Sequence, residues 1–158
     1  MGRKSTFYDQ QFRDDDWNPD DPGEYEHGLV FLAMSFVGQE MDDIYSAIKS
    51  ECVKIGLRPV RVDENTGSGF VIKEIKDLIE KAEFIIVDLT NEKPNIYYEL
   101  GYAHGVGNEA QDILLLAKEN TTLHFDIAPL RVQFYTSTDH LRKIVNTNLK
   151  EMMRVTRK

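Results

Sequence analysis

Hydrophobic and polar positions alternate from residue 29 onward in a pattern that predicts short buried strands joined by amphipathic helices. Largely apolar runs with the length of buried strands cover 29–36, 84–89 and 112–117, and weaker strand patterns cover 57–62 and 131–135. Apolar residues at helical spacing predict helices over 41–55, 71–82, 94–106 and 141–152. Gly56 stands where the first helix should end, as glycine does after many helices.

This alternation predicts the fold class. Strands joined by helices imply right-handed crossovers and a mostly parallel sheet that is covered by helices on both faces. We therefore expect an α/β fold, a three-layer flavodoxin-like domain with a five-stranded sheet in the order 2-1-3-4-5. That order makes 57–62 an edge strand, which suits Pro59. Ligands of such sheets bind at the carboxyl ends of the strands, near the switch between the first and third strands.

The charge of the chain is unevenly distributed. Residues 1–28 carry three basic and eight acidic side chains, together with several aromatic ones, and we interpret them as an acidic N-terminal arm. Residues 29–158 form the predicted α/β domain, and its last stretch, 140–158, carries six basic side chains and one acidic. The net charge of −8 argues against nucleic acid as the main partner, because phosphate backbones require a clustered positive field.

Composition also limits the partners, the cellular compartment and the cofactors that we expect. No apolar run approaches the roughly 20 residues that span a bilayer, so we expect no membrane partner. Cys52 is the single cysteine, it cannot form an internal disulfide, and its helical spacing predicts a buried side chain. The polar N-terminus favours a cytoplasmic protein. The four histidines lack metal-ligand spacing, so we expect no metal. We also expect no cofactor.

Three carboxylates should meet at the carboxyl edge of the sheet. Asp63 follows the second strand, Asp88 ends the third, and Glu99 lies in the helix that comes after it. An ionised, partly desolvated glutamate is a competent nucleophile toward an electrophilic carbon, so Glu99 is a candidate catalytic residue. Asp88 has the alternative role of capping the turn that follows it, and Asp63 the alternative of beginning an ordinary polar loop.

Other residues near this edge are candidates for binding a substrate. Ser35 and Gly38 precede the first helix, where a hydroxyl and backbone N–H groups suit a phosphate, although no P-loop spacing is present. Asn95 either caps its helix or holds a ribose hydroxyl, and Tyr98 either packs or stacks on a base. Met34 and Phe36 complete the predicted substrate-binding set from the end of the first strand.

Three segments resemble a known superfamily. The segments are FLAMSF at the end of the first strand, RVDE at the end of the second, and VDLTNEKPNIYYELGYAHG from the third strand into its helix. Together they resemble the nucleoside 2-deoxyribosyltransferase-like superfamily, whose fold neighbours include Toll/interleukin-1 receptor (TIR) domains, some of which cleave NAD. The resemblance covers about residues 29–135, and the long third segment is specific for the superfamily but not for a substrate.

The resemblance implies an enzyme that cleaves the N-glycosidic bond of a nucleoside or nucleotide. Glu99 matches the family nucleophile, and a second acid, Asp88 or Asp63, would protonate the leaving base. Transferases of the family tend to carry aspartate six residues before the nucleophile, where this chain has Lys93. Transfer to another base, hydrolysis, NAD cleavage and nucleotide sensing without catalysis are therefore all open. Related enzymes complete their sites across subunits, which implies a homo-oligomer.

Overall fold

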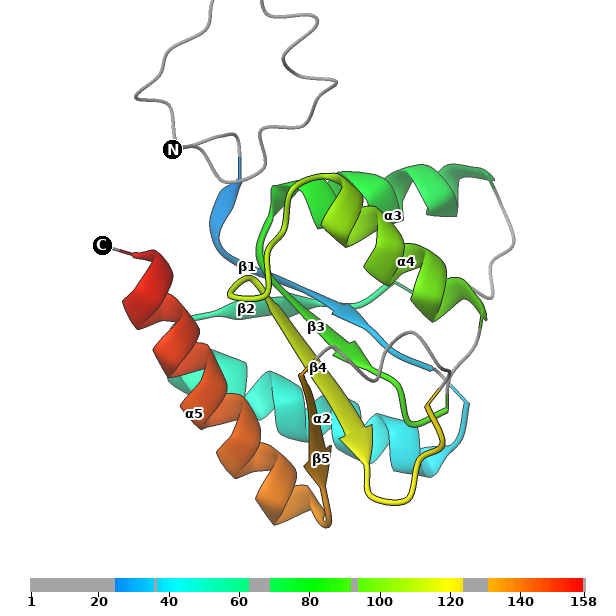
Figure 1. Ribbon diagram of the computed structural model, residues 1–158, viewed down its shortest axis with the longest axis vertical. Coiled ribbons are helices and arrows are strands. Elements are labelled where there is room, and N and C mark those ends of the chain that lie inside the picture. The colour runs from blue at the N-terminus through cyan, green and yellow to red at the C-terminus, as the bar shows by residue number, and fades with distance from the viewer. Residues whose placement is uncertain (1–24, 36, 63–68, 92–93, 124–130, 158) are drawn as a thin grey trace, which may run out of the picture.

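The computed structural model describes residues 25–35, 37–62, 69–91, 94–123 and 131–157, with the backbone alone for 69–72 and 94–95. Within these ranges, strands and helices alternate along the chain (Figure 1). The strands are β1 (Glu26–Ala33), β2 (Arg58–Val60), β3 (Ala82–Asp88), β4 (Ile113–Lys118) and β5 (Val132–Tyr135). The helices are α2 (Gln39–Lys54), α3 (Gly69–Lys81), α4 (Pro94–Gly105) and α5 (Thr138–Thr156). The predicted alternation is confirmed.

The five strands form one parallel sheet in the order β2-β1-β3-β4-β5, which confirms the flavodoxin-like prediction. Val30 of β1 lies level with Pro59 of β2 on one side and with Phe84 of β3 on the other. Because proline cannot donate to a strand ladder, Pro59 suits the edge position of β2. The winding direction reverses between β1 and β3, so the carboxyl ends of these strands mark the expected ligand site.

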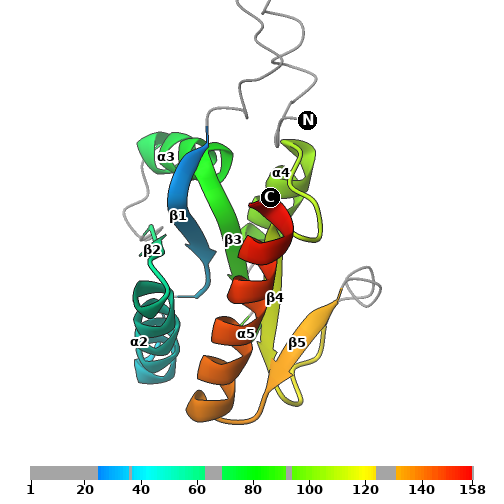
Figure 2. The same ribbon diagram turned by 90° about the vertical axis from the view of Figure 1, so that its left-hand side faces the viewer.

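Helices cover both faces of the sheet. Figures 1 and 2 show α3 and α4 on one face, with α2 and α5 on the other. Side chains of β3 alternate between the two cores: Phe84 and Ile86 pack on the side of α2 and α5, whereas Ile85 and Val87 pack on the side of α3 and α4. A strand buried on both faces is apolar at successive positions, which explains the continuous hydrophobic runs in the sequence.

The end of α2 shows how local sequence sets the element boundaries. Gly56 has a φ of +80°, a conformation that glycine adopts without steric cost. Its N–H donates to the carbonyl of Val53 (3.1 Å), and the N–H of Leu57 donates to that of Cys52 (2.9 Å). These two bonds form a Schellman motif, so the predicted role of Gly56 is confirmed.

The burial of Cys52 and the bounds of β1 were both predicted from the sequence. Cys52 is fully buried, as predicted. β1 begins at Glu26, three positions earlier than expected, and ends at Ala33, so Met34 and Ser35 follow the strand. The prediction from the apolar run missed the start of β1 because Glu26 and His27 are exposed.

No helix in the described part of the chain is long and apolar enough to cross a bilayer.

Candidate active site

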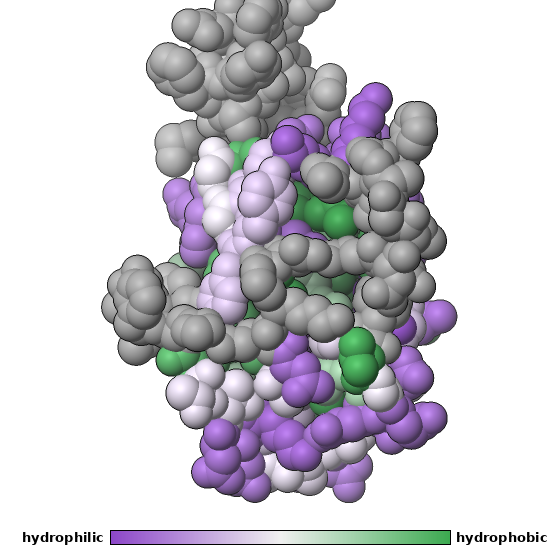
Figure 3. Space-filling model, turned by 90° about the vertical axis from the view of Figure 1, so that its right-hand side faces the viewer, coloured by the Kyte–Doolittle hydropathy of each residue, from purple (hydrophilic) through white to green (hydrophobic). Residues whose placement is uncertain are grey.

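The carboxyl ends of the central strands form the edge at which the predicted site residues should meet. In Figure 1 these ends lie at the lower right, where α2 and α4 begin. Figure 3 views the molecule from that side and shows hydrophobic surface near the middle of this face, with mostly hydrophilic side chains below it. Met34 and Ser35 lie here and are buried. Phe36, Asp63 and the side chain of Asn95 lie outside the described residues.

Glu99 is a carboxylate on the sheet-facing side of α4. Ile96, Leu100 and Ala103 of the same helix belong to the core on this face of the sheet. Because positions three and four apart share one side of a helix, Glu99 lies among these apolar residues. It is only 4% exposed. A helix position that packing alone would fill with an apolar residue therefore holds an ionisable group, and such positions are candidates for function.

Asp88 is the end of a hydrogen-bond network that joins three strands. Its Oδ1 accepts from the backbone N–H of Thr90 (2.9 Å), and its Oδ2 accepts from the hydroxyl of Tyr135 in β5 (2.8 Å). The hydroxyls of Thr90 and Tyr135 are 2.9 Å apart. Thr90 Oγ1 also accepts from the backbone N–H of Lys118 in β4 (2.9 Å). The network therefore links the carboxyl ends of β3, β4 and β5.

The donors of this network determine its direction. The N–H of Lys118 can only donate to Thr90, whose hydroxyl proton is then available to Tyr135, and the Tyr135 proton points to Asp88. Asp88 thus receives one donor at each oxygen and is 1% exposed. Its bond to Thr90 is the turn cap that the sequence offered as the alternative role for this residue. The role of Asp88 as a proton donor stays a prediction.

Replacing Tyr135 by Phe should destabilise the protein by about 1–3 kcal/mol at neutral pH, because Asp88 Oδ2 then lacks its donor. Burial raises the pKa of Asp88 above its ordinary 3.8, while donors on Thr90 and Tyr135 oppose that rise. Stability due to this carboxyl is therefore lost as the pH rises through its folded pKa, and losing a donor increases that loss. Urea unfolding at pH 7 and near pH 4 should show a smaller difference at the lower pH.

The matched control for this prediction is Tyr98→Phe. Tyr98 is 56% exposed, so its hydroxyl can exchange protein contacts for water, and the variant should unfold like the natural chain. Equal destabilisation by both substitutions would contradict a specific role for the Tyr135 hydroxyl.

The start of α2 has features that favour and features that oppose an anion. Ser35 Oγ accepts from the backbone N–H of Val37 (3.3 Å), and Gly38, with a φ of +96°, provides no side-chain cap for the helix. The first turn carries Glu40 and Asp42, whose negative charges oppose a phosphate. Binding of substrate by Ser35 and Gly38 stays a prediction.

Two cations, one at the end of β4 and one just after β2, lie beside these acids. Lys118 of β4 pairs with Glu40, and a guanidinium nitrogen of Arg61, just after β2, lies 3.9 Å from Asp42. The guanidinium of Arg61 also stacks on the ring of Tyr45 in α2, 4.0 Å from its centroid. Sequence reasoning missed Arg61, because the ring that holds it belongs to a different element and no local pattern joins the two.

The candidate residues lie on two sides of the sheet. Asp88 contacts Tyr135, which packs in the core beneath α2 and α5, whereas Glu99 belongs to α4 on the opposite face. Tyr98, the neighbour of Glu99, is largely exposed on the outer side of α4. A ligand that contacts both carboxylates would therefore have to cross the edge of the sheet between the two layers.

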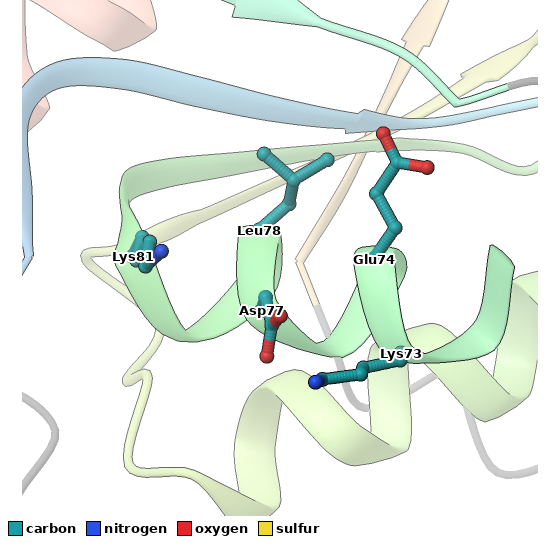
Figure 4. A pocket seen from close by; sticks show the side chains of 5 residues that line it. All are labelled: Lys73, Glu74, Asp77, Leu78 and Lys81. Atoms are coloured by element: carbon teal, nitrogen blue, oxygen red, sulfur yellow. The ribbon is translucent and has the colours of Figure 1, made fainter. Parts of the chain in front are cut away.

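A hollow of about 390 Å³ lies along α3, away from this set of residues. It is lined by Lys73, Glu74, Asp77, Leu78 and Lys81, which all belong to that one helix (Figure 4). Leu78 and Glu74 point toward the sheet, while Lys73 and Asp77 point to the other side of α3. The lining contains none of the predicted site residues, and its two basic and two acidic side chains balance in charge. We assign it no role in catalysis.

Comparison with known proteins supports the fold. No protein-family model and no curated protein matches the chain in sequence. Among solved structures, the CMP N-glycosidase BcmB of Clostridium botulinum has a TM-score of 0.55 and 22% identity, over 73% of this chain and 97% of that one.

Flavin proteins give similar scores. A flavo di-iron protein of Thermotoga maritima has a TM-score of 0.61 and 14% identity, over 82% of this chain and 37% of that one. The diflavin flavoprotein A3 of Nostoc sp. has a TM-score of 0.52 and 16% identity, over 82% and 92%. Proteins with different activities thus share this architecture, and the likeness shows a flavodoxin-like fold.

Proposed function

We propose that the protein cleaves the N-glycosidic bond of a nucleotide or nucleoside, with Glu99 as the nucleophile. The observation that carries this proposal is the burial of the Glu99 carboxylate on the sheet-facing side of α4, the helix that follows β3, one of the two strands at the switch point. The resemblance of the segment around Glu99 to the deoxyribosyltransferase-like superfamily supports it. The likeness in fold to a CMP N-glycosidase supports it further and favours a nucleotide.

The proposed reaction has two steps. A Glu99 oxygen attacks the anomeric carbon, the bond between that carbon and the base nitrogen breaks, and its electron pair leaves with the base, which takes a proton from a second acid. Water or another base then attacks the glycosyl ester and releases Glu99 as a carboxylate. A buried carboxylate suits the first step, because it has lost the hydration that weakens a nucleophile in water.

Asp88 and Asp63 are the proposed proton donors, and each can be tested separately. The structure describes Asp88, and both of its carboxylate oxygens accept hydrogen bonds. Asp63 lies outside the described residues. If Asp88 supplies the proton, Asp88→Asn should slow cleavage of natural substrates far more than cleavage of a substrate whose leaving group needs no proton. The same comparison with Asp63→Asn tests the other acid.

The test of the function is product analysis. The protein is incubated with nucleosides, nucleoside monophosphates and NAD, and liberated base is measured by chromatography. Free base or nicotinamide supports a glycosidase, and transfer to an added second base supports a transferase. Intact ligands throughout would contradict the enzymatic proposal.

A nucleotide sensor that binds without cleaving is the second candidate. It is favoured by Asp88, whose two oxygens are engaged within the fold, so that this acid is committed to structure. Calorimetry on the same ligands separates the two candidates, because a sensor binds a nucleotide and releases it unchanged. A homo-oligomer is part of both proposals, and light scattering after size exclusion tests it.

A further inference from the structure

We propose that Arg61 binds the phosphate of the ligand, so that the site takes a nucleoside monophosphate in preference to the nucleoside. This inference rests on the proposed function for the identity of the ligand. The observations that carry it concern Arg61 itself: its place at the carboxyl end of β2, the burial of its side chain, and the way its guanidinium is held.

Arg61 lies at the correct edge of the sheet. β2 runs parallel to β1 and ends at Val60, which pairs with Phe31, so Arg61 follows at the edge where β1 gives way to Met34 and Ser35. Its contacts with Asp42 and Tyr45 place its guanidinium beside the first turns of α2. The cation therefore lies on the α2 side of the edge, whereas Glu99 lies on the α4 side.

This separation matches the shape of a nucleotide. The N-glycosidic bond is at C1′ and the 5′-phosphate is attached through C4′, on the other side of the ring oxygen, so a ligand that presents its anomeric carbon to α4 can extend its phosphate toward α2. A nucleoside lacks the group that would reach Arg61. The two-sided arrangement of the site residues thus favours a ligand that crosses the switch point.

The guanidinium is held in place before any ligand arrives. Its side chain is 11% exposed, and the central carbon of the guanidinium lies over the ring of Tyr45, 4.0 Å from the ring centre. A ring over the guanidinium uses the face of this group, so its N–H donors, which lie in its plane, keep the directions that suit phosphate oxygens. Little side-chain entropy is then lost when a phosphate binds.

Asp42 lies beside Arg61 in a position where a phosphate can replace it. Asp42 Oδ1 is 3.9 Å from the nearest guanidinium nitrogen, beyond hydrogen-bond distance, and the Asp42 side chain is 57% exposed. An ion pair of this length whose carboxylate is in solvent contributes little, and a phosphate with two charges and shorter contacts would outcompete it. Lys118, by contrast, is in close contact with Glu40, and both of these side chains are half exposed. Arg61 is the more buried of these two cations.

The experiment measures binding and cleavage separately. Dissociation constants for cytidine 5′-monophosphate, adenosine 5′-monophosphate and the two nucleosides are measured by calorimetry, both in the natural chain and in a Glu99→Gln background where turnover does not interfere. Arg61→Gln should weaken binding of the monophosphates about 10- to 100-fold and leave the nucleosides within about twofold. Arg61→Lys should give an intermediate loss, since it keeps the charge without the planar fork.

Arg58→Gln is the matched control, because it removes the same charge from the same strand at the opposite edge of the sheet. Arg58 is largely exposed and pairs with Glu26. This variant should bind all four ligands like the natural chain. Equal weakening of monophosphates and nucleosides by Arg61→Gln, or no weakening of either, would overturn the inference.

Asp42→Asn gives an independent test that does not require removing Arg61. Loss of this negative charge should tighten monophosphate binding about two- to fivefold and leave nucleoside binding unchanged. If Arg61→Gln does not fold, as judged by thermal melting, an unchanged monophosphate affinity in Asp42→Asn overturns the inference. Binding that depends on Arg61 without release of base would support this phosphate site while ending the proposed catalysis, so the two failures are distinguishable.

Discussion

Replacing Glu99 by Gln should abolish release of base from the substrate, with a loss in kcat on the order of 10³-fold or more. Glutamine has nearly the shape of glutamate, but its amide oxygen is a poor nucleophile and forms no stable glycosyl ester. Because Glu99 is 4% exposed among Ile96, Leu100 and Ala103, an isosteric change preserves the packing of α4 while removing the reactive group. Initial rates of base release at saturating substrate measure the effect.

Two further variants show whether the loss is chemical. Glu109→Gln removes the same charge from an exposed position beyond the end of α4, and it should turn over like the natural chain. Glu99→Asp keeps the charge but withdraws the carboxylate by one methylene. Because attack depends on the reach of the side chain, this variant should retain only part of the activity. Melting temperatures establish that each variant is folded. Full turnover by a folded Glu99→Gln variant would eliminate Glu99 as the nucleophile.

The architecture could be predicted from the sequence because its determinants are local and repeated. The run from Phe84 to Leu89 is apolar at nearly every position and has the length of a strand, which is typical of a strand buried on both faces. Pro59 indicated an edge strand, and Gly56 indicated a helix end, each through a backbone property of one residue. The helix that carries Glu99 followed from apolar residues at helical spacing.

The partners of the site residues could not be predicted, because they are separated widely along the chain. The carboxylate of Asp88 is bound by Tyr135, 47 positions later, and the guanidinium of Arg61 rests on Tyr45 of the preceding helix. Residue type and spacing alone do not specify such pairs. The consequence is that the sequence identified Asp88 as a candidate acid but could not show that both of its oxygens accept bonds within the fold.

The opposite edge of the sheet holds a buried ion pair that no strand pattern indicates. Glu83, near the start of β3, has a fully buried side chain, and its two oxygens accept from Nε and Nη2 of Arg157 at the end of α5 (2.6 and 2.8 Å). The backbone N–H of Gly28 in β1 also donates to it (2.5 Å). This carboxylate therefore joins the last helix to the amino ends of the two central strands.

Arg157→Ala should destabilise the fold by about 3 kcal/mol at neutral pH, the lower end of the range for a broken buried pair, since Arg157 is itself partly exposed. The loss arises because Glu83 keeps its burial but loses its bidentate partner. Arg154→Ala is the matched control on the same helix: Arg154 also bonds a carboxylate through two nitrogens, but both it and Glu151 are exposed, so little or no change is expected.

The pH dependence separates this explanation from a simple loss of packing. Burial works to raise the pKa of Glu83, but Arg157 and Gly28 outweigh it and hold that pKa below the ordinary 4.5. In the natural chain, the stability from this group is therefore present above pH 4.5 and lost as the pH falls through the lower folded pKa. Without Arg157, burial prevails and raises the pKa of Glu83, so the loss of stability in Arg157→Ala should be largest at pH 7 and shrink as Glu83 becomes protonated.

Urea unfolding of Arg157→Ala and Arg154→Ala between pH 7 and pH 4 measures this dependence on pH. Equal effects of the two substitutions, or a deficit that does not change with pH, would show that the buried pair does not carry the difference.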